Sequence, residues 1–467
     1  MKNILYIFLL LAPTIVYPQP NWYKSSPMNQ AWKNVGNAGF SERGVDYISL
    51  AYSLSGEPYV AYRDFQAYPN DRASVMKFDG VNWVYVGNPD FSAGRADYTS
   101  IAFSQSGQPY VAYMDWGHFQ KATVMKFDGT NWVNVGNVGF SAGTAECISI
   151  AFSFSGQLHI AYRDWGNSAK TTVMKFDGTD WVNVGSPGFS AGMDYYTSLA
   201  FNPTDDQPFV AYLDYGASGK ATVMKFDGTN WVNVGNGGFS TGRVDYISLA
   251  FNLAGQPYVA YADSADSSKA TVKHFDGTSW VNVGNAAFST RGVAWTSLAF
   301  SPSGQPYVAF SESSLGYPPV SKATVMKFDG TNWVYLGSPG FSAGTADYTC
   351  LAFSSSGQAT VAYSDHANIN KSTVMKYDSV FVGINEQQNS RLILYPNPSL
   401  NSLTIDLTNI PGKFYDIEII DIRNINIFET HTDAKKIVVD LTNYLAGVYF
   451  VKLKMTDSIY IEKFCKN

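Results

Sequence analysis

Apolar and polar residues alternate in short runs along most of this chain, and the runs recur in a fixed order. One copy, over 99–136, contains four runs, at 100–104, 110–113, 122–127 and 132–135. A period of two is the pattern of a half-buried β-strand. Short turns rich in Gly, Asn, Asp and Pro join the first run to the second and the third to the fourth, which makes neighbouring strands antiparallel. Each copy is therefore predicted to form one four-stranded sheet.

The copies follow one another with a period of about fifty residues, and a tryptophan marks the fourth run of each. This tryptophan occurs seven times, at Trp32, Trp83, Trp132, Trp181, Trp231, Trp280 and Trp333. Four-stranded sheets at this period are typical of β-propeller blades. The series begins with a lone fourth run and ends with a copy that lacks a regular one, so the first run is expected to complete the last blade. An open stack of sheets, the alternative, would leave that strand unpaired.

We therefore predict an all-β chain with a closed seven-bladed β-propeller over 28–383, whose N-terminal strand closes the last blade. A phenylalanine also recurs in the link between copies, and with the tryptophans it is expected to fill the space between blades. These residues are Phe40, Phe91, Phe140, Phe189, Phe239, Phe288 and Phe341.

The N-terminus differs from the repeats. Lys2 precedes an apolar run over 4–16 that is too short to span a bilayer as a helix. This pattern predicts a secretory signal peptide over 1–19 and no transmembrane segment in the mature chain. The net charge of −6 over 467 residues offers no basic surface to nucleic acid, so no nucleic-acid partner is expected.

The loop between the second and third strands carries an acid in every copy, followed by a lysine or arginine. In four copies an aromatic residue directly follows the acid. An exposed ring can stack on a sugar ring while a carboxylate accepts hydrogen bonds from sugar hydroxyls. These loops share one face with the long links between copies, and loops of this kind often carry binding sites. The candidate ligand-binding residues are Asp64, Phe65, Asp115, Trp116, Asp164, Trp165, Asp214 and Tyr215.

Two structural interpretations compete with this one. The acids could fasten their own loops by accepting hydrogen bonds from backbone amides and by pairing with the lysines. The rings could pack against an Asp–Tyr pair of the neighbouring blade, such as Asp97 and Tyr98. The residue pattern leaves both interpretations open.

Little in the chain suggests catalysis. The five histidines occupy unmatched positions, so neither a metal cluster nor a histidine-based triad is expected. An acid repeated in every copy is a poor candidate for a unique catalyst. Cys147 stands where another copy has Tyr98, and Cys350 where it has Ser100, so we interpret both as variants of repeat positions. We expect no catalytic residue, no metal and no cofactor, and hence a protein that is not an enzyme.

After residue 383 the repeat stops, and 384–392 is predicted to be a polar linker. Five alternating runs follow, at 403–407, 415–420, 437–441, 448–453 and 459–464. They predict a small Ig-like β-sandwich over 393–467.

This last segment carries ordered motifs: Leu-Tyr-Pro-Asn-Pro at 394–398, an alternating stretch over 415–421, Leu-Ala-Gly-Val-Tyr-Phe-Val-Lys at 445–452 and Lys-Phe-Cys-Lys at 463–466. Together they resemble the type A C-terminal sorting domain of the type IX (Por) secretion system of Bacteroidetes. The motif residues are Tyr395, Pro396, Asn397, Pro398, Gly447, Tyr449, Lys452 and Lys463. The resemblance implies export to the periplasm, passage through the outer membrane by the type IX secretion machinery, and release or attachment at the cell surface.

The repeats resemble uncharacterised propeller arrays on such secreted proteins, which indicates an architecture and not an activity. The favoured function is non-catalytic binding of glycans through several weak subsites on the long-loop face. The alternative is a scaffold for protein interaction or adhesion that uses the same face. A carbohydrate-active hydrolase is the third hypothesis.

Overall fold

The computed structural model describes residues 29–65, 71–313, 320–380, 392–408, 410, 414–421, 426–454 and 459–466. The predicted signal peptide and nearly all of the predicted linker lie outside these residues. The chain divides into two compact units, of which one spans Gln30–Ser379 and the other contains Val380–Asn467. In the described part of the chain, no helix has the length and apolar character needed to span a bilayer.

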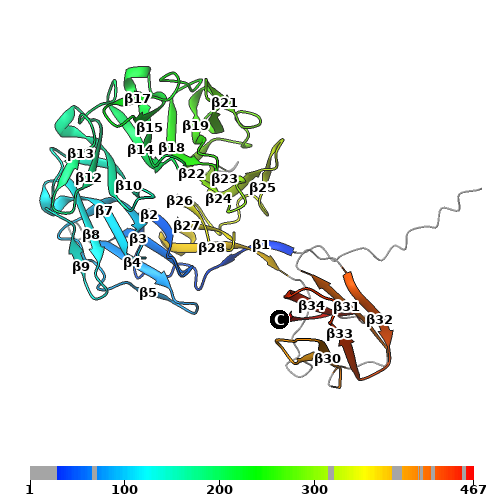
Figure 1. Cartoon of the computed structure of the whole chain (residues 1–467). Coiled ribbons are helices and arrows are strands. Elements are labelled where there is room, and N and C mark those ends of the chain that lie inside the picture. Colours follow the sequence, from blue (N-terminus) through cyan, green and yellow to red (C-terminus); the bar gives the residue numbers. More distant parts are fainter. Residues whose placement is uncertain are drawn as a thin grey trace, which may run out of the picture. The chain divides into compact units, whose positions relative to one another are not determined.

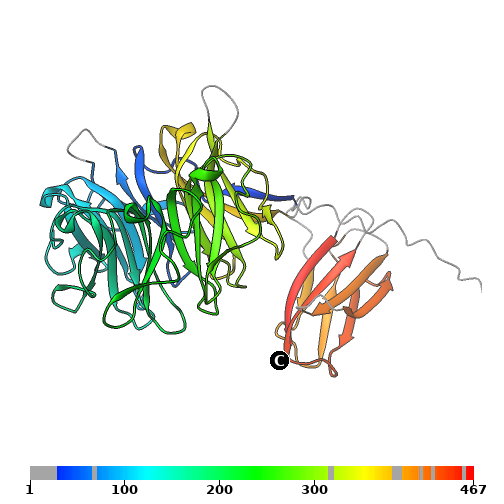
Figure 2. The ribbon, with the colours of Figure 1, turned by 90° about the horizontal axis from the view of Figure 1, so that it is seen from above.

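The larger unit consists of repeated four-stranded antiparallel sheets of the propeller-blade type, arranged radially (Figure 1). Figure 2 shows the same sheets edge-on, with their strands running between the two faces. The prediction of an all-β chain built from such sheets is confirmed. In chain order, sheets 1 to 7 are β2–β5, β6–β9, β10–β13, β14–β17, β18–β21, β22–β25 and β26–β28 with β1.

The innermost strands are β2 (Val45–Tyr52), β6 (Ala96–Phe103), β10 (Ala145–Phe152), β14 (Asp194–Phe201), β18 (Val244–Phe251), β22 (Val293–Phe300) and β26 (Ala346–Phe353). The second strands are β3 (Pro58–Asp64), β7 (Pro109–Asp115), β11 (Leu158–Asp164), β15 (Pro208–Asp214), β19 (Pro257–Asp263), β23 (Pro306–Ser313) and β27 (Ala359–Asp365). The third strands are β4 (Ala73–Phe78), β8 (Lys121–Phe127), β12 (Lys170–Phe176), β16 (Lys220–Phe226), β20 (Lys269–Phe275), β24 (Ser321–Phe328) and β28 (Lys371–Val380). The outermost strands are β5 (Trp83–Tyr85), β9 (Trp132–Asn134), β13 (Trp181–Asn183), β17 (Trp231–Asn233), β21 (Trp280–Asn282), β25 (Trp333–Tyr335) and β1 (Asn29–Asn34).

Neighbouring sheets meet through the repeated Phe and Trp, as predicted. Trp132 stacks on Phe91 with ring centroids 4.4 Å apart, and its Nε1 donates a hydrogen bond to the carbonyl oxygen of Val86 at 2.7 Å. The N-terminal strand takes part in the same way, because Trp32 stacks on Phe341 at 4.1 Å and donates to a carbonyl of the preceding sheet. This outer seam buries a large aromatic pair at each contact between sheets and satisfies the indole N–H.

A second set of contacts joins the innermost strands. The Oγ of Ser100 in β6 accepts a hydrogen bond from the Ile150 amide in β10 at 3.3 Å. Five other serines make the same bond to the next sheet. Between β26 and β2 the acceptor is the sulfur of Cys350, which lies 3.4 Å from the Leu50 amide nitrogen. A thiol thus occupies the serine's place where the last innermost strand meets the first.

The C-terminal unit contains two sheets, with strand orders β29-β30-β33 and β32-β31-β34-β35. The strands are β29 (Ile393–Tyr395), β30 (Ser402–Asp406), β31 (Tyr415–Asp421), β32 (Asn426–Thr432), β33 (Lys436–Asp440), β34 (Gly447–Lys454) and β35 (Ile459–Lys466). Both sheets contribute to one core, which includes Leu403, Ile417 and Val451. The sequence did not predict β29 or β32. In β32, an edge strand, no described side chain is fully buried, so its apolar pattern is weak.

Candidate functional site

Each of the four candidate acids ends a second strand and accepts hydrogen bonds from its own loop or from the third strand of its sheet. Asp115 accepts a hydrogen bond from the Gly117 amide at 2.9 Å and another from Thr123 Oγ1 at 3.1 Å. Asp164 and Asp214 make the same pair of bonds, and Asp64 accepts from Ser74. All four carboxylates are buried. Their partners are amides, hydroxyls and, for Asp115, the His118 imidazole at 2.7 Å, and not the lysines, which favours a loop-fastening role for the acids.

In sheets 2 to 4 the aromatic residue after the acid begins a short 3₁₀ helix, with the acid as its N-cap. These helices are η1 (Trp116–His118), η2 (Trp165–Asn167) and η3 (Tyr215–Ala217), and η4 (Ser264–Asp266) and η5 (His366–Asn368) are their equivalents without the large ring. The exposed fractions are 38% for Phe65, 36% for Trp116, 50% for Trp165 and 44% for Tyr215. The loop geometry therefore keeps large rings in contact with solvent in four consecutive sheets.

Each of these rings has an arginine guanidinium over it. The distances from the guanidinium carbon to the ring centroid are 5.3 Å for Arg63 and Phe65, 5.0 Å for Arg95 and Trp116, 4.8 Å for Arg163 and Trp165, and 5.9 Å for Arg243 and Tyr215. Cation–π contact stabilises such pairs, most strongly where water is excluded.

Each arginine is also paired with an acid of an innermost strand. Arg63 bonds Asp46 and Asp97, Arg95 lies 2.9 Å from Asp97, Arg163 lies 3.0 Å from Glu146, and Arg243 lies 3.2 Å from Asp245. We call each ring with its arginine and that acid a rim unit. The rim units comprise Phe65 with Arg63 and Asp46, Trp116 with Arg95 and Asp97, Trp165 with Arg163 and Glu146, and Tyr215 with Arg243 and Asp245.

Trp116 also donates its indole N–H to Asp97 at 2.9 Å. Asp97 lies in β6, the innermost strand of the same sheet, and not in a neighbouring one as the packing interpretation supposed. The Trp116 amide bonds to the carbonyl of Arg95 in the link between sheets, so this loop and this link share a face. The sequence analysis did not identify the arginines. Two of them lie in second strands and two in links between sheets, and only the folded chain places one arginine beside each ring.

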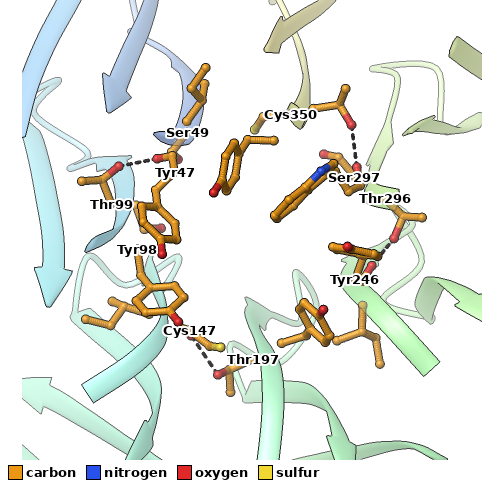
Figure 3. Close-up of a pocket in the computed structure, with 18 of the residues that line it drawn as sticks. Tyr47, Ser49, Tyr98, Thr99, Cys147, Thr197, Tyr246, Thr296, Ser297 and Cys350 are labelled. Atoms are coloured by element: carbon orange, nitrogen blue, oxygen red, sulfur yellow. Dashed lines mark hydrogen bonds between the residues drawn. The ribbon is translucent and has the colours of Figure 1, made fainter. Parts of the chain in front are cut away.

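The innermost strands surround a cavity of about 430 Å³ (Figure 3). Each of them has a shift in pairing register, as between Asp97 and Ser100 in β6. The bulge residue has a positive φ, between 50° and 57°, in every innermost strand. These residues are Tyr47, Tyr98, Cys147, Tyr196, Tyr246, Trp295 and Tyr348, and all of them line the cavity. An aromatic residue in this conformation is uncommon, and a bulge re-aims its side chain.

The aromatic members of this set, which we call the collar, touch one another around the cavity. Tyr47 lies 4.7 Å from Tyr98 and 5.3 Å from Tyr348, measured between ring centroids. Trp295 lies 4.1 Å from Tyr348 and 4.8 Å from Tyr246, which in turn lies 5.0 Å from Tyr196. Cys147 interrupts the series between Tyr98 and Tyr196.

The lining of the cavity is neutral. Besides the collar it consists of Ser, Thr, Ile and Cys side chains and Tyr195, and no residue that lines it carries a formal charge. Burial raises the pKa of Tyr47 to about 12 and that of the Cys147 thiol to about 12, so both groups stay protonated at neutral pH. The surface thus offers aromatic faces and hydroxyls, which suits binding more than proton abstraction.

The sequence analysis missed the collar, because the bulge breaks the alternation of period two and the first strand was expected to begin only at residue 100. The available signal was an aromatic residue after an acid in several copies, together with its replacement by Cys147.

In the C-terminal unit, the sorting motifs meet at the last strand. Asn397 accepts a hydrogen bond from the Cys465 amide at 2.9 Å and donates one to the Lys463 carbonyl at 3.0 Å. Tyr449 is buried and stacks on Phe464, with ring centroids 5.6 Å apart. Pro396 and Pro398 are exposed. Gly447 and Lys452 lie in β34, which pairs with β35 along its length.

Comparison with known proteins supports the assignment of this unit. Residues 393–467 match the family model of the secretion system C-terminal sorting domain. This segment is therefore such a domain, and it links the protein to type IX secretion and the cell surface, as the motifs indicated. The signal peptide stays a prediction.

For the rest of the chain, the similar proteins match at low sequence identity or over only part of their length. Ulvan lyase NLR42 of Nonlabens ulvanivorans is 26% identical over 103 residues, which are 22% of this chain and only 19% of that protein. The surface component PorZ of the type IX secretion system of Porphyromonas gingivalis is 14% identical, with a TM-score of 0.47 over 90% of this chain and 59% of that one. A PL25 polysaccharide lyase bound to a saccharide is 12% identical, with a TM-score of 0.47 over 74% of this chain and 96% of that one.

These findings correct one expectation. The inference that the chain is not an enzyme is wrong, because its curated relative is a lyase and points to a possible carbohydrate-active enzyme. The absence of histidine clusters and of a unique pair of acids does not exclude catalysis, and the segment shared with the lyase covers 22% of the chain.

Proposed function

We propose that this protein recognises carbohydrate at the cell surface, through the rim units of sheets 1 to 4. The observation that carries the proposal is that four exposed rings each lie beside a guanidinium and a carboxylate. A sugar presents a weakly polar face and a rim of hydroxyls. An aromatic ring suits the first, and donor and acceptor groups fixed beside it suit the second.

Within each rim unit the roles differ. The exposed rings Phe65, Trp116, Trp165 and Tyr215 contact the ligand through the face or edge that the arginine leaves open. The buried acids Asp115, Asp164 and Asp214 position the rings by capping the loops, and Asp64 holds its loop to the third strand through Ser74. Several such contacts on one face add their affinities, so weak subsites suffice for an extended chain of sugars.

We also infer that sheets 1 to 7 form a closed seven-bladed ring and that the C-terminal unit is Ig-like. The first inference is supported by β1, which pairs with β28, and by the contact of Cys350 with Leu50, which repeats the serine contacts elsewhere. The second is supported by two antiparallel sheets that share one core.

The test is glycan-array binding of the full chain, followed by the double variant Trp116→Ala with Trp165→Ala. We expect at least a tenfold loss of affinity, because stacking on an aromatic ring is worth on the order of 1 kcal/mol and two rings are removed. Phe119→Ala is the matched control, since that ring is 87% exposed but belongs to no rim unit. Equal losses in both variants, or no glycan binding in the wild type, would refute the proposal and favour a protein partner on this face.

A carbohydrate-active enzyme is the second candidate function, favoured by the sequence shared with the ulvan lyase. Ulvan incubated with the protein would then be shortened, and the release of new chain ends would grow with time and enzyme concentration. Binding of ulvan without new chain ends would count against catalysis on this substrate.

A further inference from the structure

Two rim units share the same arrangement of an arginine between two rings. They differ in the number of carboxylates that bind the arginine. Arg63 and Arg163 occupy equivalent positions in β3 and β11, and both are buried. Each guanidinium lies between an exposed ring and a ring at the cavity wall. Arg63 lies between Phe65 and Tyr47, at 5.3 Å and 5.0 Å, and Arg163 lies between Trp165 and Tyr195, at 4.8 Å and 5.2 Å.

The two arginines differ in how many carboxylates they bind. Arg63 bonds Asp46 of its own sheet through one terminal nitrogen and Asp97 of the next sheet through the other. Arg163 bonds Glu146 of its own sheet at 3.0 Å. At the position equivalent to Asp97, the next sheet has Tyr195, which carries no charge. One arginine is therefore matched by two acids and the other by one.

Other charged groups near Arg163 do not replace the missing acid. Asp164 is bonded to the Gly166 amide and to Thr172. Asp194 is fully buried and accepts a hydrogen bond from Thr171 at 2.9 Å. Burial raises its pKa to about 7, so much of its population is neutral at neutral pH. The Nε of Arg163 is buried without a hydrogen-bond partner, and so is the Nε of Arg63, so the two arginines differ only at their terminal nitrogens.

The sheet of Arg163 also departs from the repeat in its bulge residue. Cys147 and Tyr195 both line the cavity, and Cys147 stands where six other sheets have an aromatic residue. A thiol thus takes the place of a phenol or an indole in sheet 3. Three departures from the repeat, at Cys147, Asp194 and Tyr195, thus gather around one arginine.

We propose that Arg163, with Trp165 on one side and Tyr195 on the other, forms a subsite for an anionic group on the carbohydrate ligand, either a carboxylate or a sulfate ester. The proposal rests on the carbohydrate recognition proposed above. A guanidinium presents planar donors that match an oxyanion, and the flanking rings hold it in one plane. Partial burial strengthens the attraction, since less water screens it. At Arg63 both terminal nitrogens are already used by Asp46 and Asp97.

The decisive variant is Tyr195→Asp, which copies the residue found at 97 and supplies Arg163 with its second carboxylate. The probes are a glucuronate-containing oligosaccharide and a sulfated oligosaccharide, each with its carboxyl-reduced or desulfated counterpart. We expect the wild type to prefer at least one acidic probe over its neutral counterpart. We expect Tyr195→Asp to lose about tenfold in affinity for that probe and to bind the neutral one unchanged, because a charge-assisted hydrogen bond is lost.

Ala294→Asp is the matched control, since it adds the same charge at the equivalent position of β22, away from any rim unit. An equal loss in this control would show a general charge effect and overturn the subsite. Equal binding of acidic and neutral probes by the wild type would overturn the subsite and leave carbohydrate recognition standing.

If the wild type binds no oligosaccharide, the proposed function fails, and inorganic sulfate tests the subsite by itself. Sulfate stabilises folded proteins in general because it is excluded from their surface, so a bound sulfate predicts an additional rise. The excess of sulfate over chloride in raising the melting temperature, at matched ionic strength, should be larger in the wild type than in Tyr195→Asp. The same rise in both proteins would refute the subsite.

Discussion

The outer seam and the inner rim of the larger unit derive from the same repeat, but they tolerate substitutions differently. The inner rim comprises the rim units and the bulge residues of the innermost strands. In the seam, each tryptophan of an outermost strand stacks on a phenylalanine, with centroids 4.1 Å to 4.5 Å apart, and donates its indole N–H to a carbonyl. In the rim, the position before the bulge residue varies among Asp46, Glu146, Tyr195 and Ala294, and the bulge residue itself varies among Tyr, Trp and Cys.

The difference follows from packing. The seam must fill the same closed volume at every contact, and a smaller residue would leave a cavity there. The rings of the rim units face solvent and the bulge residues line the central cavity, so a substitution at these positions costs less folding energy than one in the seam. Departures from the repeat therefore accumulate where they can change binding, and those around Arg163 are the clearest set.

The largest expected effect comes from breaking the seam. Trp181→Ala should lower the free energy of unfolding by about 3–5 kcal/mol, because it removes a buried indole and its hydrogen bond to the Val135 carbonyl. Trp165→Ala is the matched control with an exposed ring, and it should cost less than about 1 kcal/mol. Urea unfolding followed by circular dichroism measures both. Similar losses in the two variants would mean that rim rings are structural.

The next effect concerns Asp194, which stands where all six other sheets have Ala or Val. Burial raises the pKa of this carboxyl from 3.8 to about 7. Between pH 4 and 7 the folded protein holds a proton that the unfolded chain releases, so stability falls as pH rises through this window, by roughly 2–4 kcal/mol in total. Asp194→Asn should remove most of this slope and should be more stable than the wild type at pH 8.

Chemical unfolding at several pH values tests the contribution of Asp194. Asp64, whose pKa burial raises to about 6, should supply a remaining slope of the same sign in the variant. Asp180→Asn, in an exposed turn, should keep the wild-type pH dependence. An unchanged slope in Asp194→Asn would show that Asp194 ionises normally in the folded protein.

A smaller effect distinguishes the role of the acids, which hold the loops, from the role of the rings, which are proposed to contact the ligand. Asp115→Ala should cost about 1–2 kcal/mol of stability, because the Gly117 amide and the Thr123 hydroxyl lose their acceptor. Any loss of glycan affinity should follow from the altered position of Trp116. Melting temperature and glycan binding of the same variant are compared. Normal melting with abolished binding would instead make Asp115 a ligand contact.

The smallest effect is expected at the contact between β26 and β2. Cys350→Ser restores the residue of the other sheets, and its hydroxyl should accept the Leu50 amide hydrogen bond better than sulfur does. We expect a gain of about 0.5–1 kcal/mol in unfolding free energy. Cys350→Ala, which removes the acceptor, should lose stability by a similar amount. Equal stability of the Ser and Ala variants would mean that this contact contributes nothing.

Much of the fold could be predicted from the chain. The alternation and the recurring tryptophan placed the strands of the sheets to within a few residues, and the motifs of residues 393–467 identified the sorting domain. The first strands were predicted to begin too late, at 100 instead of 96 in the second sheet, because the bulge at Tyr98 interrupts the period. The exposed rings of the candidate site were named, but their arginines and the collar were not.

The sequence by itself determined the sheets, their order and the sorting domain, because these depend on local alternation, short turns and motifs that a linear pattern contains. Only the tertiary structure decided which side chains share a rim unit. Arg163, Glu146 and Tyr195 come from three different strands, and their shared geometry follows from the packing of one sheet against the next. Whether an arginine is matched by two acids or by one depends on that packing, so the difference between Arg63 and Arg163 is visible only in the folded chain.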